Sequence, residues 1–289
     1  MTLFIAGCGV YEGSLTRELV EVLDLADTIY VDLYTMPDPG WVLEILRPWS
    51  GKVKIANRRL LEEGSHSIVR EGIEKNVVIL SAGDPLIATT HQSLVAEAVL
   101  AGVQVRYVPG ISGVCVAKAY SGLSYYRFGR TATVPGQWRG VKPYSVIATI
   151  YANLCTESHT LLLLDVSDEG TQLSPREAAL RLLGTEGEIL SNLNVKPILD
   201  NTPVIVVERA GAPDARILVY DSLVELSKTE VAFRTPSSLV VPAPLNPVEL
   251  WILESRLGLK LKPHWSKRVY GRSDCCKYYE LLLSWLKEV

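Results

Sequence analysis

The chain has 289 residues, a length that suits two domains of roughly 110 to 150 residues each. Hydrophobic residues make up 48% and charged residues 21% of it, which excludes an intrinsically disordered chain. A net charge of −3 excludes the strong basicity of a typical nucleic-acid-binding protein, and the apolar runs are too short to span a membrane. The N-terminus lacks the basic start and cleavage site of a signal peptide, so we predict a cytoplasmic protein with no direct contact to nucleic acid or membrane.

Cysteine and histidine spacing gives no sign of a metal site. The five cysteines are scattered and include no C-x-x-C pair, which favours ordinary thiols over a disulfide framework or a zinc site. The four histidines (His66, His91, His159 and His264) show no metal-binding spacing. His91 stays open between an active-site contact and an ordinary solvated or hydrogen-bonding residue.

The first part of the chain alternates β-branched runs with helical patterns. Leu19, Val22 and Leu23 recur at helical spacing between two such runs, and 94–99 shows the same spacing. This alternation predicts a largely parallel, helix-covered sheet and an N-terminal α/β domain over 1–112. Five strands are predicted, at Thr2–Ala6, Thr28–Leu33, Lys52–Ala56, Val77–Ser81 and Val103–Val108.

The periodicity fails over 124–144, where glycine and proline indicate a connection. A second α/β pattern predicts a C-terminal domain over 113–258, which includes this connection, followed by an extension over 259–289 that ends in an amphipathic stretch. Ala212-Pro213-Asp214 predicts a hairpin between the second and third strands of this domain. Strands are predicted at Thr160–Val166, Pro203–Glu208, Arg216–Tyr220 and Ser238–Val241, and helices at Pro175–Leu183 and Pro247–Leu257.

Gly7-Cys8-Gly9 follows the first predicted strand, and Asp32 ends the second. This is part of a dinucleotide fingerprint, so an NAD(P)-dependent oxidoreductase that uses Gly7, Gly9 and Asp32 is one alternative. However, Glu12 stands where the third glycine belongs, and a carboxylate there would repel a pyrophosphate. A tight turn that requires glycine is the simpler interpretation.

Gly83-Asp84-Pro85 follows the fourth predicted strand, at the carboxyl end where α/β sheets bind ligands. Helix capping by Asp84 or Thr90 is the structural alternative. A carboxylate with apolar neighbours and no basic residues suits a cation such as S-adenosylmethionine better than a phosphate.

Several motifs occur in an order that points to one family. They are G-C-G-V-Y-E at 7–12, G-D-P-L-I-A-T-T-H at 83–91, Y-R-F-G-R-T at 126–131, L-L-L-L-D-V at 161–166 and R-A-G at 209–211. With them the chain resembles the diphthine synthases over residues 1–257. The resemblance implies two α/β domains of the tetrapyrrole-methylase type, with the cofactor in the interdomain cleft, and a homodimer.

The resemblance also implies the reaction and the site. The expected reaction is S-adenosylmethionine-dependent N-methylation of the modified (3-amino-3-carboxypropyl) histidine of translation elongation factor 2. No catalytic side chain is assigned. Pro109-Gly110-Ile111-Ser112 is closer to the porphyrin methylases, which keeps a porphyrin or corrin-precursor methyltransferase as an alternative. The cofactor contacts carried over are Val10, Asp84, Ile87, Ser112, Gly113, Leu164, Ala210 and Ser237.

A folded protein acceptor requires a docking surface. The connection over 124–144 is rich in arginine, lysine and aromatic residues and contains no acidic residue. Arginine and aromatic enrichment is typical of interface cores, so this segment is one candidate for binding the acceptor. A solvated linker is the alternative.

Overall fold

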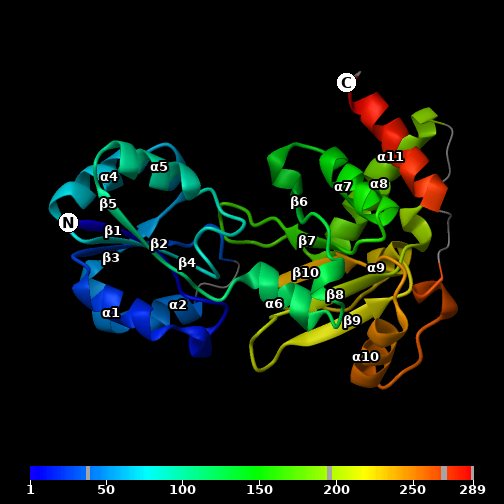
Figure 1. The fold of residues 1–289 in the computed structure, drawn as a ribbon, viewed down its shortest axis with the longest axis horizontal. Helices are drawn as coiled ribbons and strands as arrows, with labels where there is room; N and C mark the ends of the chain where they lie inside the picture. The colour runs from blue at the N-terminus through cyan, green and yellow to red at the C-terminus, as the bar shows by residue number, and fades with distance from the viewer. Residues whose placement is uncertain (37–39, 194–196, 268–271, 288–289) are drawn as a thin grey trace. The chain divides into compact units, whose positions relative to one another are not determined.

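The computed structural model describes residues 1–36, 40–193, 197–267 and 272–287. The chain divides into two units. The first comprises Met1–Val116, Val166–Thr171 and Ala210–Asp214, and the second comprises Ala117–Asp165, Gln172–Arg209 and Ala215–Val289. Figure 1 shows one sheet in each unit, with helices packed against it. The two α/β domains predicted from the sequence are thereby confirmed.

The first unit contains a five-stranded sheet in the order β3-β2-β4-β1-β5. All neighbouring strands are parallel, as the alternation of strands and helices predicted. The central strands are buried along their whole length because helices cover both faces of the sheet. The strands are β1 Thr2–Gly7, β2 Thr28–Asp32, β3 Val53–Ala56, β4 Val77–Ser81 and β5 Gln104–Val108.

The helices of this unit form two layers, with α1 and α2 on one side of the sheet and α4 and α5 on the other (Figure 1). Alternate residues of β1 serve the two layers, because successive strand side chains point to opposite faces. Phe4 and Ala6 pack in the α1 layer, and Leu3 and Ile5 in the α4 layer. The helices are α1 Arg17–Leu25, α2 Gly40–Ile45, α3 Arg58–Glu62, α4 Ser65–Glu74 and α5 Gln92–Leu100. Helix α6, Gly113–Tyr120, contains the boundary between the two units, after Val116.

The second sheet has the order β6-β7-β10-β8-β9 and is mixed. Only the β6–β7 pair is parallel, while β7, β10, β8 and β9 pair antiparallel. The predicted hairpin is the β8–β9 pair. Strand β6 was not predicted, because three residues inside the glycine- and proline-rich connection are too few to show a period. The strands are β6 Ala132–Val134, β7 Thr160–Leu164, β8 Val204–Glu208, β9 Arg216–Tyr220 and β10 Ser237–Val241.

Local signals set some helix ends of the second unit and packing set others. The predicted helix from Pro247 is α10, Pro247–Leu257, which starts with an Asn246 capping box and ends at Gly258, whose φ is 66°. By contrast, the predicted 175–183 helix extends through Gly184 and Gly187, because Ile189 and Leu190 still face the core. The remaining helices are α7 Tyr144–Cys155, α8 Pro175–Leu193, α9 Leu223–Lys228 and α11 Arg272–Leu286. None of the helices described is both long and apolar enough to cross a membrane.

The described residues after 258, which are 259–267 and 272–287, belong to the second unit. Trp265 is 1% exposed, and its indole N–H donates to Asp221 at 2.8 Å. α11 lies along α7 (Figure 1), and Cys276 forms a disulfide with Cys155, 121 residues earlier. The prediction that all cysteines are ordinary thiols was therefore wrong. The pairing depends on the packing of α11 against α7, which cysteine spacing does not reveal.

Candidate functional site

Three loops meet at the carboxyl ends of β4, β1 and β5. Gly7, Gly83 and Gly110 pack there backbone against backbone, and a Cβ on Gly7 would lie 2.3 Å from the Gly83 carbonyl oxygen and 2.9 Å from the Gly110 nitrogen. Gly9, with a φ of 77°, exchanges two main-chain hydrogen bonds with Gly83, at 3.1 and 2.7 Å. Glycine is therefore required at Gly7 and Gly9 for close approach of the loops and for a left-handed turn.

Asp84 lies inside this junction, 5% exposed. Its Oδ1 accepts a hydrogen bond from the Leu86 N–H at 3.0 Å, and its Oδ2 accepts from the Tyr107 hydroxyl and from the Gly110 N–H at 3.4 Å. All three donors are neutral, and among the described residues no Lys, Arg or His forms an ion pair with this carboxylate. Within the described part of the chain, no cationic side chain therefore compensates the charge of the Asp84 carboxylate.

The neighbouring candidates add apolar surface and main-chain groups. Ile87 is 41% exposed, beside Ala88, whose φ of 60° is uncommon for a residue other than glycine. Gly113 begins α6, and a Cβ there would meet only Val10 Cγ1, at 3.9 Å, so the space beside Gly113 is open. Ser112, just before α6, is 7% exposed. The first unit thus brings together Val10, Asp84, Ile87, Ser112 and Gly113.

Ala210 joins the same unit through a separate loop. A Cβ on Gly211 would lie 2.8 Å from Val10 Cγ2, so residues 210–214 pack beside the loop that follows β1. The left-handed backbone at Arg209 and Gly211, with φ of 49° and 90°, turns the chain there. Sequence order alone placed Ala210 with the second domain.

Leu164 and Ser237 belong to the second unit. Antiparallel pairing of Ser238 with Leu163 places Ser237 and Leu164 side by side at one end of the sheet. Both residues are buried. Gln172 brackets Ser237, accepting from its N–H at 2.8 Å and donating to its carbonyl at 3.1 Å.

Tyr107 and Gln172 are the residues of these two regions that the sequence did not single out. Burial and the hydrogen bond to the Asp84 carboxylate raise the pKa of Tyr107 to about 12, so its hydroxyl stays protonated and continues to donate. The available signal was a tyrosine near the end of a predicted strand, two residues before Pro109-Gly110. Gln172 had no such signal.

Asp32, the acid of the dinucleotide alternative, is 0% exposed. It accepts hydrogen bonds from the Thr35 N–H at 3.2 Å and the Thr35 hydroxyl at 2.8 Å, and it faces His91. A ribose hydroxyl would need an exposed carboxylate there. Helix capping by Asp84 or Thr90 is not observed, because Asp84 accepts from Leu86 within its own loop and the N-cap of α5 is His91, which makes no side-chain capping hydrogen bond.

Most basic and aromatic side chains of the 124–144 segment form contacts within the protein. The segment as a whole is therefore not available as a docking interface. Arg139 donates twice to Asp165, at 2.9 and 3.1 Å, and Trp138 donates to the same carboxylate at 2.9 Å. Lys142 and Tyr144 both bind Glu188. Composition could not distinguish an interface from internal pairing, because the acidic partners lie outside the segment.

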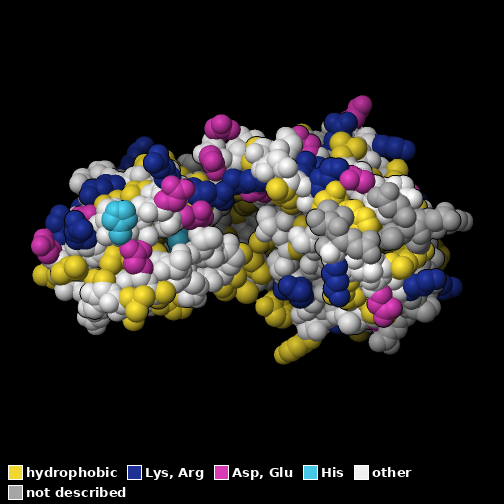
Figure 2. Space-filling view, turned by 90° about the horizontal axis from the view of Figure 1, so that it is seen from above, with side chains coloured by type: hydrophobic (Ala, Val, Ile, Leu, Met, Phe, Trp, Pro, Cys, Tyr) yellow, Lys and Arg dark blue, Asp and Glu magenta, His cyan; other side chains and the backbone are white. Residues whose placement is uncertain are grey.

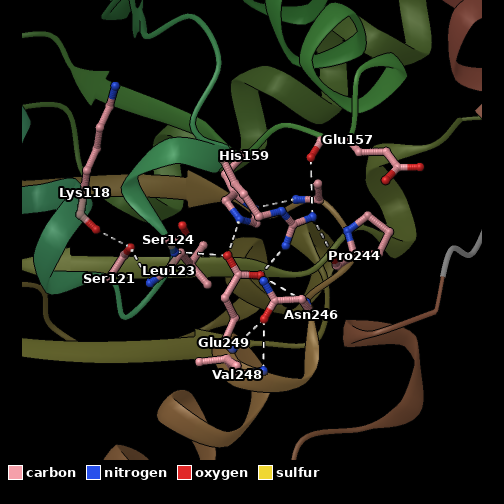
Figure 3. A network of polar contacts seen from close by, with 12 residues as sticks. Lys118, Ser121, Leu123, Ser124, Glu157, His159, Pro244, Asn246, Val248 and Glu249 are labelled. Atoms are coloured by element: carbon pink, nitrogen blue, oxygen red, sulfur yellow. Dashed lines mark hydrogen bonds and ion pairs between the residues drawn. The ribbon is translucent and has the colours of Figure 1, made fainter.

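Arg127 of this segment, which is partly exposed, joins a polar network around the buried carboxylate of Glu249. Figure 3 shows Glu249 with His159, Ser124 and Asn246 beside it. Glu249, at the start of α10, accepts from Arg127, from His159 Nε2 at 3.0 Å, and from the N–H groups of Ser124 and Asn246, both at 3.0 Å. Burial alone would raise the pKa of Glu249, but these hydrogen bonds lower it to about 2. His159 Nδ1 accepts from the Ala243 N–H at 3.0 Å, so the ring is neutral, and burial lowers its pKa. The network anchors the segment to α10.

Several side chains of the segment remain exposed, among them those of Tyr126 and Arg130. Tyr126 is 98% exposed, and the Arg130 side chain is exposed while its main chain is held by Asn153, at 3.1 and 2.8 Å. Basic and acidic side chains are interspersed over the face seen in Figure 2. In the described part of the chain, no group of three His, Cys, Asp or Glu residues is arranged to hold a metal ion.

Comparisons with known proteins agree across the chain. Residues 2–224 match the family model of the Tetrapyrrole (Corrin/Porphyrin) Methylases. A diphthine synthase of Aeropyrum pernix is 41% identical over 272 residues, covering 93% of this chain and 92% of the relative. The crystal structure of a conserved hypothetical protein from Aeropyrum pernix K1 superposes with a TM-score of 0.89 at 39% identity, covering 96% and 98% of the two chains. A diphthine synthase crystal structure gives 0.78 at 27% identity, covering 93% and 100%.

Proposed function

We propose that this chain, which belongs to the diphthine synthase family of the tetrapyrrole methylases and is an S-adenosylmethionine-dependent methyltransferase, methylates the amino group of the modified histidine on translation elongation factor 2. The amino group is the one of the 3-amino-3-carboxypropyl side chain. Similarity along nearly the whole chain supports this function. The cytoplasmic location and the homodimer stay predictions.

The observation that carries the proposal is the uncompensated charge of Asp84. S-adenosylmethionine is a cation with an ammonium group and apolar parts, so its site needs acceptors, apolar surface and no basic cradle. The first unit offers the Asp84 carboxylate, the apolar side chains of Val10 and Ile87, and open space beside Gly113. The residues present therefore fit this cofactor.

Each of these residues has a limited task in methyl transfer. The bound cofactor supplies a methyl group on a sulfonium, which already carries its own leaving group. The protein then has to align the acceptor amine with that methyl group and exclude competing water. We assign Asp84 and the main chain near Ile87 and Gly113 to binding and orientation. Leu164 and Ser237 of the second unit remain predicted contacts.

The attacking amine must lose its proton before each transfer. Tyr107 is unsuited as a base, because its pKa of about 12 keeps the hydroxyl protonated and donating to Asp84. Asp84 already accepts three hydrogen bonds. We therefore assign the amine proton to water and no side chain to its removal.

The porphyrin alternative rested on Pro109-Gly110-Ile111-Ser112. Gly110 has a structural reason of its own, since a Cβ there would lie 2.1 Å from the Gly83 carbonyl oxygen. This part of the motif reflects how three loops pack and says little about the acceptor.

Labelled methyl transfer tests the function directly. The chain is incubated with methyl-labelled S-adenosylmethionine and elongation factor 2 that carries the precursor histidine, with a porphyrin precursor in a parallel reaction. We expect label in the elongation factor alone. Label only in the porphyrin would move the chain to the alternative, and label in neither would leave the proposal without support.

A further inference from the structure

His91 ends the G-D-P-L-I-A-T-T-H motif and is 2% exposed. Its Nδ1 lies 2.9 Å from the carbonyl oxygen of Pro85, inside the loop that contains Asp84. A carbonyl can only accept a hydrogen bond, so Nδ1 must carry a proton. The ring therefore ties the start of α5 back to the loop.

The other ring nitrogen faces a carboxylate. His91 Nε2 is buried without a hydrogen-bond partner and lies 3.4 Å from Oδ2 of Asp32, which ends β2 and is fully buried. Asp32 accepts two hydrogen bonds from Thr35, a pattern that suits an ionised carboxylate. A neutral ring would leave an unprotonated nitrogen beside that buried negative charge, which is unfavourable in a site removed from solvent. A doubly protonated ring converts the same contact into an ion pair.

The other titratable groups around the His91 ring are neutral or paired with each other, so Asp32 is the charged group that faces the ring. Burial raises the pKa of Cys8 to about 12, with Asp32 adding to the shift, and burial also raises the pKa of Tyr34. Both are neutral near pH 7. Two further charges, Glu62 and Arg58, lie near Tyr34 and influence its pKa in opposite directions. They form an ion pair with each other at 3.6 Å, and Glu62 also accepts a hydrogen bond from the Thr90 hydroxyl at 3.2 Å.

We propose that His91 is a positioning residue, an imidazolium held by Asp32 that fixes the Pro85 carbonyl and thereby the Asp84 loop for the methyl donor. The Thr89 hydroxyl donates to the same carbonyl at 2.5 Å, so the loop is closed at two points. The inference rests on the proposed function, because it assumes that this loop binds the cofactor. In this proposal Asp32 stabilises the protonated His91 ring and makes no contact with the cofactor.

The protonation state tests the first half of the proposal without any ligand. In long-range ¹H–¹⁵N spectra of the full chain labelled at histidine, we expect both His91 nitrogens to be protonated at pH 7. In Asp32→Asn the ring should become neutral, with its proton on Nδ1. A neutral His91 in the unmodified chain would overturn the proposal.

Two substitutions separate the contacts of the ring. His91→Asn keeps a donor near the Nδ1 position, whereas His91→Gln loses it. We expect His91→Gln to weaken S-adenosylmethionine binding roughly tenfold by calorimetry, and His91→Asn to keep the Kd within about threefold of the unmodified chain. His66→Asn, the same change at an exposed histidine on α4, should leave the Kd unchanged. Equal weakening in both His91 variants, or none in either, would overturn the proposal.

These outcomes are separate from the fate of the proposed function. The spectra and the calorimetry contain no elongation factor, so a chain that fails to methylate it can still show the protonated ring and the difference between the two variants. Methylation of the elongation factor together with a neutral His91 would instead retain the function and reject the positioning role.

Discussion

The loop after β4 and the start of α10 each contain a buried carboxylate, and the two differ in what surrounds them. Glu249 accepts from the Arg127 guanidinium, the neutral His159 ring and two main-chain N–H groups, so a cation compensates its charge. Asp84 accepts from one hydroxyl and two main-chain N–H groups, all of them neutral.

This difference indicates that Glu249 stabilises the fold, whereas Asp84 is suited to binding a ligand. A carboxylate paired inside the protein joins elements together, and removing it leaves other groups unpaired. A carboxylate that accepts hydrogen bonds only from neutral donors keeps its full negative charge, so a cationic ligand can bind to it favourably. Substitutions at the two positions should therefore affect different quantities.

The largest effect should follow Glu249→Ala, which leaves the partly exposed Arg127 without its counter-charge, leaves the buried His159 ring without its acceptor and removes the Glu249 half of the α10 capping box. We expect a loss of about 4 kcal/mol in the free energy of unfolding of the second unit, measured by urea denaturation. Cofactor affinity should be unchanged while the chain remains folded. Glu63→Ala, at an exposed ion pair, should change stability by less than about 0.5 kcal/mol. An equally small change in stability for Glu249→Ala would contradict the claim that Glu249 stabilises the second unit.

The disulfide also distinguishes the two regions, because both of its cysteines lie in the second unit, where they join positions 121 residues apart in the sequence. Cys276→Ser should lower the free energy of unfolding by about 3 kcal/mol, since the unfolded chain gains freedom. Cys155→Ser should cost the same, and the double variant should cost no more than either single one. Additive losses would show that the two thiols act independently.

Asp84→Asn should act on ligand binding. The change removes the uncompensated charge at nearly constant shape, so we expect S-adenosylmethionine affinity to fall by about 2 kcal/mol, roughly 30-fold in Kd. Stability should fall by only about 1 kcal/mol, because an amide satisfies the loop donors less well. Glu12→Gln removes an exposed charge from the end of the same junction and serves as the control. Unchanged affinity in Asp84→Asn would contradict the binding role.

Acid should remove the advantage that Glu249 confers. Its folded pKa of about 2 lies below its ordinary value of 4.5, so its stabilisation is complete above pH 4.5 and is lost as pH falls from there towards 2. The stability difference between the unmodified chain and Glu249→Ala should therefore shrink, by on the order of 2 kcal/mol, between pH 5 and the acid end of this window. A difference that stays constant over this range would show that another group carries it.

The smallest effects concern the acceptor. Tyr126→Ala and Arg130→Glu alter two exposed side chains of the 124–144 segment, and we expect each to raise the KM for elongation factor 2 by about fivefold, near 1 kcal/mol. The Kd for the cofactor should not change. Arg70→Glu, an exposed reversal on α4, is the control. If all three variants behave alike, the segment is not the docking surface.

Much of the fold could be predicted because its signals are local. Strands β1 to β5 follow from β-branched runs between turn residues, and α10 from Asn246, Pro247 and Gly258, each of which sets a helix end by its own geometry. Strand β6 and the extension of α8 past Gly184 could not be predicted. They depend on β7 and on a core formed by distant residues, which outweigh weak local preferences.

Within the candidate site, the sequence by itself determined the types of residue and the loops that carry them: the glycines, Asp84, and Ser112 before α6. Only the tertiary structure decided what each one contacts. It showed that Gly7, Gly83 and Gly110 meet, that Tyr107 donates to Asp84, and that Asp32 faces His91. It also paired most cations of 124–144 with acids elsewhere. The physical reason is that the residue type fixes whether a side chain can be charged. Whether that charge is paired depends on residues that are distant in the sequence and come close only when the chain folds.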